Sequence, residues 1–484
     1  MKRIYTLTLT ALLLAGGSAM AQQTPTGPLT LEQCIQYALE NSMNVQNAVL
    51  DEQIANAKVK ETVGIGLPQI NGTASANYNP QLPRFFATKA TAYNFSGGTV
   101  PIDQFLPGVG MNDVVAMAPF FQLKGNGNAN IAVTQMLFNG SYLVGLQASK
   151  TFKDLAIRAT KQTREQTVEN VRKAFYSALI NRERSKLFDN NIARVDSLLR
   201  NTKALNENGF AESIDVDRIQ VSLNNLTTER DKFQKLQELS IELLKFQMNY
   251  PMEGSLDVTG EISKDATSVD WDSYLDGWSK KNRSDYELLE TNRRAQQLTL
   301  RNKYAASLPS LSANLNYGYS TQSQNIGGIF KTNSAFSEKN GVGPDKWYAV
   351  SSYGVSLNLP IFSGLQRSYQ IQQEKIRLRK IENTFKTLES SIDLQVKQST
   401  IGYQNAIASL ESQQRNMDLA ARVARVTRIK YEQGVGSNIE VVDAESSLKE
   451  AQVNYYNALY DALVAKTDLD KAFGKLLPAS TEIK

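Results

Sequence analysis

The chain has 484 residues with one cysteine and no histidine, and its 53 Lys and Arg against 48 Asp and Glu give a formal charge of +5. The lack of histidine excludes His-based general bases, catalytic triads and His metal sites, and the single cysteine excludes an intrachain disulfide. So small a charge excess on so long a chain predicts no surface for nucleic acid.

Residues 1–21 have the layout of a cleavable secretory signal. Lys2-Arg3 precedes an apolar run over 7–14, and Ala19-Met20-Ala21 supplies small residues around a cleavage site. We therefore expect the mature chain to begin at Gln22. The apolar run is too short to span a bilayer, and no later segment offers about 20 consecutive apolar residues, so no transmembrane helix is expected in the mature chain.

The remaining sequence presents the same features twice in the same order. Leu67-Pro68 recurs as Leu308-Pro309, and the turn Asn208-Gly209 recurs as Gln433-Gly434. Each proline predicts a helix-to-strand junction, because proline cannot continue the helical hydrogen bonds and drives the preceding residue to an extended conformation. A tandem duplication explains this order. We expect a first repeat at 22–250, a linker at 251–270, a second repeat at 271–474 and a tail at 475–484.

In the first repeat, the pattern predicts a helix from Leu31 to Gly64 with Thr30 as its N-cap. Alternating apolar and polar residues then predict a strand over 68–78. Residues 80–127 are rich in proline, glycine and asparagine, which predicts a long irregular loop before a returning strand at 128–138.

A long helix follows to about Glu207, and the turn at Gly209 leads into a second helix with Ser213 as its cap. Apolar residues at 3–4 spacing on this second helix predict a coiled-coil seam. They are Val216, Ile219, Leu223, Leu226, Leu236, Leu239, Leu243 and Phe246.

The second repeat predicts a helix from Trp271 to Ser307, a strand at 309–319, a loop at 320–346 and a strand at 347–359. A long helix, a turn at Gly434 and a last helix to about Phe473 follow. A tilted strand needs about 9–11 residues to cross a bilayer, and tyrosines at strand ends are typical of interfacial girdles. Tyr317, Tyr319 and Tyr353 fit such a girdle, although they would also suit the core of a soluble sheet.

The predicted fold is mainly α with a small β part. Four strands in one chain cannot close a barrel, and open strand edges are not tolerated in lipid. Several copies of the chain must therefore share one barrel, with the long coiled-coil helices of each copy forming a helical tube. The assembly predicted from these elements is a conduit.

Several short segments carry a resemblance to a known family. They are Leu29-Thr30-Leu31-Glu32-Gln33 with Ala38-Leu39-Glu40-Asn41, Asn282-Arg283-Ser284-Asp285, both Leu-Pro junctions, Leu359-Pro360-Ile361-Phe362-Ser363-Gly364, and Tyr431 to Asp443. In this order across two repeats they resemble the TolC family of outer-membrane efflux proteins.

The resemblance implies a homotrimer in the outer membrane of a Gram-negative bacterium, with a twelve-stranded barrel in lipid above a periplasmic α-helical tunnel. It implies a passive exit duct for a tripartite efflux or type I secretion system, without cofactor or enzymatic activity. The implied partners are a periplasmic adaptor (membrane fusion) protein and an inner-membrane RND pump or ABC exporter. The helix-tip turns at Gly209, Gly434 and Gly436 are the expected docking region for the adaptor.

The resemblance also implies an acidic aperture at the tunnel tip. Its positions fall on Glu440 and Asp443, with Asp215 as the first-repeat counterpart, and three copies of each would form negative rings able to bind a divalent cation. The two second-repeat acids would also complement the dipole of the helix that they begin, and both roles stay open. A family member can carry a latching arginine where this chain has Gly436, so we expect the resting tip to be held differently.

Two other function classes compete with the conduit. A secreted periplasmic coiled-coil scaffold would explain the helices but not the proline-led amphipathic strands. An enzyme is the third possibility, but the sequence shows no paired carboxylates in tuned surroundings and no phosphate-binding glycine pattern. Cys34 lacks the His partner that a nucleophile needs, and we expect it to be a small buried residue.

Overall fold

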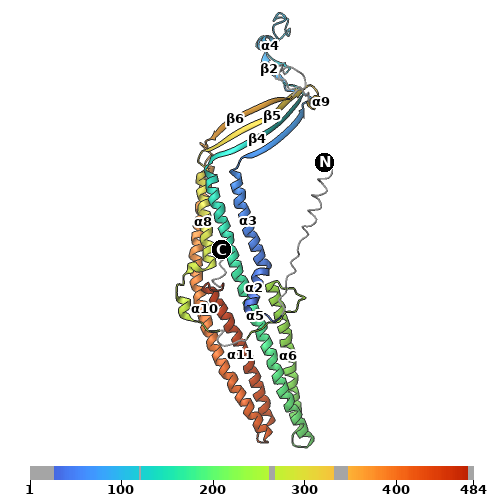
Figure 1. Ribbon diagram of the computed structural model, residues 1–484, viewed down its shortest axis with the longest axis vertical. Helices are drawn as coiled ribbons and strands as arrows, with labels where there is room; N and C mark the ends of the chain where they lie inside the picture. Colours follow the sequence, from blue (N-terminus) through green and yellow to red (C-terminus); the bar gives the residue numbers. More distant parts are fainter. Residues whose placement is uncertain (1–26, 119–121, 261–266, 332–346, 478–484) are drawn as a thin grey trace, which may run out of the picture. The chain divides into compact units, whose positions relative to one another are not determined.

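The computed structural model describes residues 27–118, 122–260, 267–331 and 347–477, so the expected signal segment lies outside the described residues. The chain divides into two units, each assembled from separate stretches of sequence (Figure 1). A helical unit comprises Met1–Ala55, Phe152–Arg294 and Arg379–Lys484, and a second unit with the main sheet comprises Asn56–Thr151 and Ala295–Leu378.

The main sheet has four antiparallel strands in the order β1-β4-β5-β6. They are β1 (Gln69–Tyr78), β4 (Gly125–Asn139), β5 (Ser310–Ser323) and β6 (Tyr348–Asn358). A strand therefore lies in each of the four places where the sequence predicts one. Because β4 of the first repeat pairs with β5 of the second, both repeats contribute to one sheet. Among the described residues, one edge each of β1 and β6 has no neighbouring strand.

The register of the sheet separates an apolar face from a polar one. Residues directly opposite each other in antiparallel strands share a face. Ile70, Val133, Leu315 and Tyr353 form one cross-strand row, and the adjacent row consists of Asn71, Ala132, Asn316 and Ser352. The apolar face continues through Ile131, Tyr317 and Val355, whereas asparagine, serine and threonine dominate the other face. The alternation predicted from sequence is thus present across all four strands.

The expectation of an irregular loop over 80–127 is wrong in part. This segment contains β2 (Phe85–Thr88), α4 (Lys89–Phe95) and β3 (Val114–Met117), and β2 pairs with β3 in a separate two-stranded sheet. Lys89 is buried and donates from Nζ to the carbonyls of Leu106 (3.0 Å) and Val109 (2.9 Å). These two hydrogen bonds join the start of α4 to residues 106–109 of the same segment.

The helices of the first repeat are α2 (Leu31–Asn41), α3 (Met43–Ile65), α5 (Gly140–Glu207) and α6 (Ser213–Met248). Thr30 caps α2 in a capping box with Gln33, which confirms the predicted start. The predicted single helix over 31–64 is wrong, because Ser42 is extended (φ −60°, ψ 128°) and separates α2 from α3. The Nδ2 of Asn249 donates to the carbonyl of Asn41 at this break (3.0 Å).

The second repeat also begins with a broken helix. The predicted helix over 271–307 is instead α7 (Trp271–Leu275), the short 3-10 helix η2 (Lys280–Asn282) and α8 (Ser284–Ala305). Gly277 has φ +62°, which ends the helical path. The break lets Trp271, Tyr274 and Trp278 pack against a core that contains Tyr403 and Phe473.

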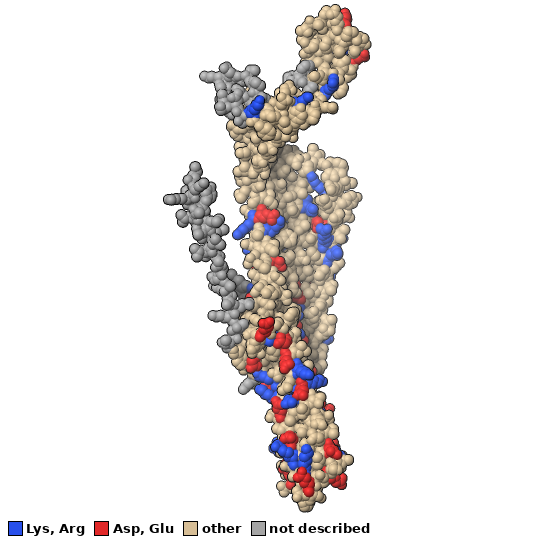
Figure 2. Space-filling view, turned by 90° about the vertical axis from the view of Figure 1, so that its right-hand side faces the viewer, with Lys and Arg blue, Asp and Glu red and all other residues tan. Residues whose placement is uncertain are grey.

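The chain ends with the long helix α10 (Gln366–Glu432) and the helix α11 (Asn438–Ala472). No helix in the described part of the chain is long and apolar enough to span a membrane. On the face shown in Figure 2, charged side chains gather over the helical unit in the lower part of the view.

One buried cluster of the helical unit joins the chain start to the linker between repeats. Cys34 and Ala38 are fully buried there with Leu244, Met248 and Val258. Burial raises the pKa of the Cys34 thiol to about 12, so the thiol stays protonated near neutral pH. Val258 pairs with Leu29 in an isolated bridge, and the expected polar linker therefore contributes to the core.

Candidate functional site

The turns that join α5 to α6 and α10 to α11, which we call the hairpin tips, have matching geometry. Gly209 has φ +79° and Gly434 has φ +75°. In each turn the residue after the glycine donates its N–H five residues back, from Phe210 to Leu205 (2.8 Å) and from Val435 to Lys430 (3.0 Å). This is the left-handed C-terminal geometry that glycine adopts without a steric penalty, and its repetition follows the duplication in the sequence.

Gly436 allows the chain to pass close to the end of α10 at the second tip. A Cβ placed there would lie 3.1 Å from the Cβ of Lys430 and 3.1 Å from the backbone N of Tyr431. The chain therefore approaches the last turn of α10 more closely than a side chain would comfortably allow. A side chain at this position would require its neighbours to move by a few tenths of an ångström, which favours glycine here.

The predicted acidic residues occupy two different environments. Glu440 and Asp443 are exposed on α11, and no ion pair of either is found among the described residues. Asp215 is half-buried and lies 3.6 Å from Arg218 in the first turn of α6. Glu440 and Asp443 are therefore free to present negative charge, whereas Asp215 has a cation beside it.

The predicted cap of α6 is wrong, while α11 has a cap that the sequence reading missed. Glu212, not Ser213, occupies the N-cap position of α6, and no side chain there bonds the helix. Ser437 caps α11 by accepting from the backbone N–H of Glu440 (3.4 Å). The start of α11 therefore has a side-chain cap, whereas the start of α6 does not.

A set of polar links joins the first hairpin (α5 and α6) to the second hairpin (α10 and α11). The buried Thr202 shares a hydrogen bond with the hydroxyl of Tyr431 (3.0 Å). The Nδ2 of the buried Asn438 donates to the carbonyl of Asp215 (2.9 Å). Farther from the tips, Asn191 donates to Gln452 (2.9 Å) and Lys449 pairs with Glu229 (3.2 Å).

A charged link between the hairpins centres on Glu445 of α11. Its side chain is only 7% exposed, and its two carboxylate oxygens accept from Arg194 of α5 (3.2 Å) and Arg428 of α10 (3.0 Å). Hydrogen bonds to charged groups contribute about 1.5–3 kcal/mol each. We call Glu445 with these two arginines the hairpin tie.

An apolar cluster surrounds these polar links. Phe188 stacks on Phe233 with ring centroids 5.1 Å apart, and Ile219 and Val441 are fully buried beside them. Since Val441 comes from the second hairpin and the other three come from the first, separating the hairpins would expose apolar surface as well as break polar links.

Glu445 was missed in the sequence, although a signal was present. It lies on the buried side of α11 with Val441, Ala444 and Leu448. A carboxylate among apolar helix positions needs a partner charge, because burying an unpaired charge is costly. This pattern could have predicted that Glu445 is a buried, paired carboxylate. It could not have predicted that Arg194 is its partner, because Arg194 is far away in sequence.

The two Leu-Pro junctions lie in the unit with the main sheet and take the same form. Leu67 donates its N–H to Gly64 and Leu308 donates to Ala305, each at 3.0 Å, so a tight turn precedes both prolines. Pro68 and Pro309 then lead directly into β1 and β5. They position strands and lie in a different unit from the hairpin tips.

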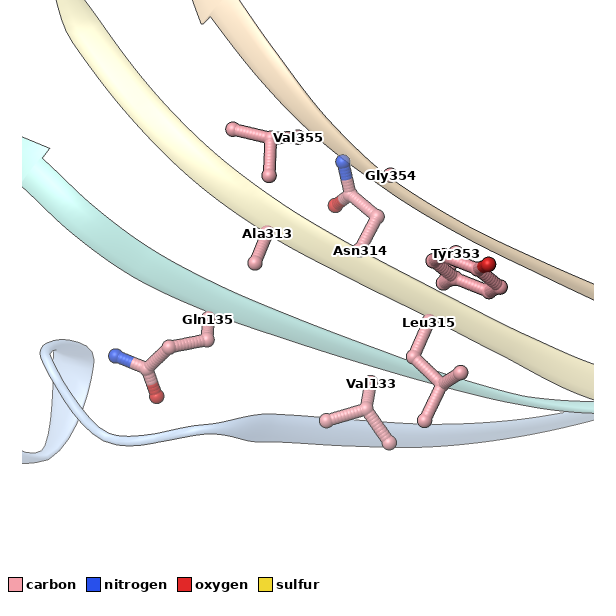
Figure 3. A pocket seen from close by; sticks show the side chains of 8 residues that line it. All are labelled: Val133, Gln135, Ala313, Asn314, Leu315, Tyr353, Gly354 and Val355. Atoms are coloured by element: carbon pink, nitrogen blue, oxygen red, sulfur yellow. The ribbon is translucent and has the colours of Figure 1, made fainter.

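The apolar face of the main sheet carries a shallow hollow (Figure 3). It is lined by Val133, Gln135, Ala313, Asn314, Leu315, Tyr353, Gly354 and Val355, from β4, β5 and β6. This lining has no charged group and is suited to apolar contact. Within the described residues no group of three or more acidic or Cys side chains could hold a metal ion.

Comparison with known proteins gives a consistent set of matches. Residues 279–475 match the family model described as outer membrane efflux protein. The chain is 22% identical over 321 residues to the probable efflux pump outer membrane protein TtgC and to the antibiotic efflux pump outer membrane protein ArpC, both of Pseudomonas putida. Each match covers 66% of this chain and 62% of the relative, which is less than two thirds of the relative's length.

Solved structures share the fold. The structure of CusC matches with a TM-score of 0.70 and 15% identity over 94% of this chain and 95% of that one. The Campylobacter jejuni CmeC outer membrane channel matches with a TM-score of 0.67 and 15% identity over 93% and 87%. The mainly helical fold class with a small sheet predicted from sequence is confirmed.

Proposed function

Since the chain belongs to the TolC family of outer-membrane efflux proteins, we propose that it forms the passive exit duct of an efflux system in the outer membrane of a Gram-negative bacterium. Substrate enters from a periplasmic adaptor and an inner-membrane pump, passes along the helices and leaves through the strands. The chain binds no cofactor and does no chemistry on the substrate. The energy for export comes from the pump.

The observation that carries this proposal is the two-faced sheet with unpaired edges. A membrane-spanning strand needs an apolar face toward lipid and a polar face toward the lumen, as the Ile70 and Asn71 rows provide. Backbone groups at the free edges of β1 and β6 must find partners in lipid. Pairing β6 of one copy with β1 of the next satisfies them and closes a barrel.

Unpartnered apolar stripes on the helices support a ring of three copies. On α6, Leu239 (65% exposed) and Phe246 (72%) form a stripe with Leu243, at the C-terminal end of the predicted coiled-coil seam. On α10, Leu419, Val423 and Val426 are also about half exposed. The two stripes lie on different hairpins. In a ring of identical copies, one surface of each copy meets a different surface of the next copy, and the two stripes could supply these two surfaces.

The hairpin tips serve as the gate in this proposal. Glu440 and Asp443 line the aperture in three copies and favour cations, including divalent ions. The hairpin tie, with the links at Thr202 and Asn438, holds the two hairpins of one copy together in the place of a latch at position 436. The turns at Gly209, Gly434 and Gly436 form the surface that the adaptor contacts.

An efflux pump is the preferred partner system. The relatives TtgC and ArpC are named as components of efflux pumps, one of them for antibiotics, which favours small-molecule export over polypeptide secretion. An inner-membrane RND pump with its periplasmic adaptor is therefore the proposed partner, and an ABC exporter is the alternative.

Membrane fractionation with mass measurement tests the proposal. The full-length chain should appear in the outer-membrane fraction, resist a carbonate wash, and have the mass of a trimer by light scattering after detergent extraction. A chain lacking residues 2–21 is the control and should stay in the cytoplasm. Release of the full-length chain by the wash, without detergent, would contradict the duct and favour the periplasmic scaffold.

A further inference from the structure

The loop between β5 and β6 contains a feature that the duct does not explain. The short helix α9 (Ile326–Ile329) contacts β1, β4 and β5 of the main sheet. We propose that α9, with Phe330 and Trp347, is an anchor in the lipid–water interface of the outer leaflet, a proposal that rests on the duct described above.

Glycines in β4 show which face of the sheet α9 covers. A Cβ placed on Gly127 would lie 2.7 Å from Ile329 and 2.9 Å from the indole of Trp347, and a Cβ on Gly125 would lie 3.3 Å from Ile329. In the register of the sheet, Gly125 and Gly127 share a face with Ile131 and Val133. Helix α9 therefore lies on the apolar face, which is the lipid-facing side in the proposed duct.

The contact between α9 and the sheet is close, and the indole N–H beside it is paired. Ile329 is 1% exposed, and its carbonyl accepts from the indole Nε1 of Trp347 (2.9 Å). With this donor paired, the indole ring can lie in apolar surroundings without an unsatisfied N–H. Any side chain larger than glycine at position 127 would displace this packing.

Two large apolar side chains of the same segment are exposed in the part of the chain that the structure describes. Ile326 is 50% exposed and Phe330 is 71% exposed, and Lys331 follows them at the surface. Exposing an isoleucine and a phenylalanine to water next to an already apolar face is unfavourable. Lipid at this position would bury both.

The height of α9 along the strands places it at the membrane boundary. Tyr317 and Tyr319 lie on the same face, with their hydroxyls 3.2 Å apart. Helix α9 covers Thr321, two positions beyond Tyr319, on the strand end remote from the long helices. At about 3.4 Å per residue and a strand tilt of about 40°, this is about 5 Å above the tyrosines along the barrel axis. Tyrosine and tryptophan concentrate at this interfacial depth in membrane barrels.

Lipid fits this surface better than a second copy of the chain does. Neighbouring copies pair through the backbone edges of β1 and β6, whereas α9 lies on the apolar face of the sheet, over β4, β5 and β1. The central strands of a barrel segment face lipid on the apolar side and have no neighbouring chain above them.

Spin labels on single cysteines test the anchor in the assembled protein in phosphatidylcholine vesicles. Cys34 is fully buried, so it does not compete for the label. Labels at Phe330→Cys and Ile326→Cys should collide severalfold more often with oxygen, which partitions into lipid, than with a water-soluble nickel chelate. A label at Phe86→Cys is the matched control, because Phe86 is 68% exposed on the separate β2–β3 sheet, and it should favour the nickel chelate.

A label at Tyr353→Cys separates failure of the anchor from failure of the duct. Tyr353 is 90% exposed in the middle of the apolar face and should favour oxygen if that face meets lipid. Oxygen preference at Tyr353 with nickel preference at Phe330 would overturn the anchor alone. Protection of Phe330 from both reagents would show a protein partner and would also overturn it. Nickel preference at both positions would overturn the duct itself.

Discussion

Glu445 is the residue whose replacement most directly tests the proposed gate at the hairpin tips. Its carboxylate bridges α5, α10 and α11 through Arg194 and Arg428. In Glu445→Gln the side chain keeps its size but loses its charge, which leaves two arginines close together without a counter-charge. We expect the hairpins to separate more readily and the single-channel conductance in a planar bilayer to rise severalfold.

Glu450→Gln is the matched control for this variant, because Glu450 is exposed on the same helix. It should leave the conductance unchanged. Equal conductance of Glu445→Gln and the wild type would show that the hairpin tie does not restrain opening.

Glu169 gives a pH-dependent prediction. Burial raises its pKa, but hydrogen bonds and charge attraction from Lys173 (2.7 Å) and Lys471 (2.6 Å) outweigh burial and leave the pKa below its usual value. A carboxylate with a lowered folded pKa stabilises the protein above the pKa of unfolded glutamate, about 4.3, and loses that contribution as pH falls through its own lower pKa.

The apparent melting temperature of Glu169→Gln should therefore lie below that of the wild type at pH 7. The difference between the two proteins should narrow as pH falls below about 4. A difference that stays constant between pH 7 and pH 3 would contradict this assignment of the ion pairs.

At the scale of elements, the hairpin turns depend on left-handed glycines. Gly434→Ala places a Cβ at φ +75°, which costs about 1–2 kcal/mol. Gly402 lies inside α10 with open space around it, so Gly402→Ala should stabilise the helix by about 0.5–1 kcal/mol. Thermal melting in detergent should therefore shift in opposite directions for the two variants. A shift in the same direction would contradict the role of the turn.

The sequence predicts some element boundaries better than others, for physical reasons. The Leu-Pro junctions and the Gly209 and Gly434 turns were found because proline and left-handed glycine act locally. The breaks at Ser42 and Gly277 were missed because tertiary contacts accompany them, through Asn249 in one case and the Tyr403 core in the other. The predicted seam on α6 packs within the chain at Ile219 and Leu226 but is exposed at Leu239 and Phe246, and periodicity alone does not distinguish an internal core from a surface that meets another copy.

At the scale of the whole molecule, the apolar stripe on α6 predicts how copies associate. Leu239→Asp combined with Phe246→Asp places two charges where we expect a neighbouring copy, so the trimer should dissociate at lower detergent concentration. Gln234→Asp is the control, because Gln234 is exposed on a different face of α6 from Leu239 and Phe246, and it should leave the trimer intact. Light scattering across a detergent series measures both. A double variant as stable as the wild type would place the stripe outside the interface.

The duplication explains why the architecture could be predicted from sequence while the gate could not. Two repeats of helix, strand, loop, strand and helix pair imply four strands, and the open edges of the sheet imply several copies. The positions Glu440 and Asp443 came from the resemblance to the TolC family and not from a local pattern alone. The hairpin tie instead depends on Arg194 and Glu445 meeting across the fold, which one sequence without the structure does not specify.

Single-channel conductance of the purified trimer in a planar bilayer, with a divalent-cation titration from each side, tests the duct most directly. We expect discrete conductance steps that divalent ions reduce only when added from the side of the hairpin tips, and larger steps in Glu445→Gln. Membrane-inserted trimers that conduct in neither the wild type nor Glu445→Gln would contradict the proposed duct.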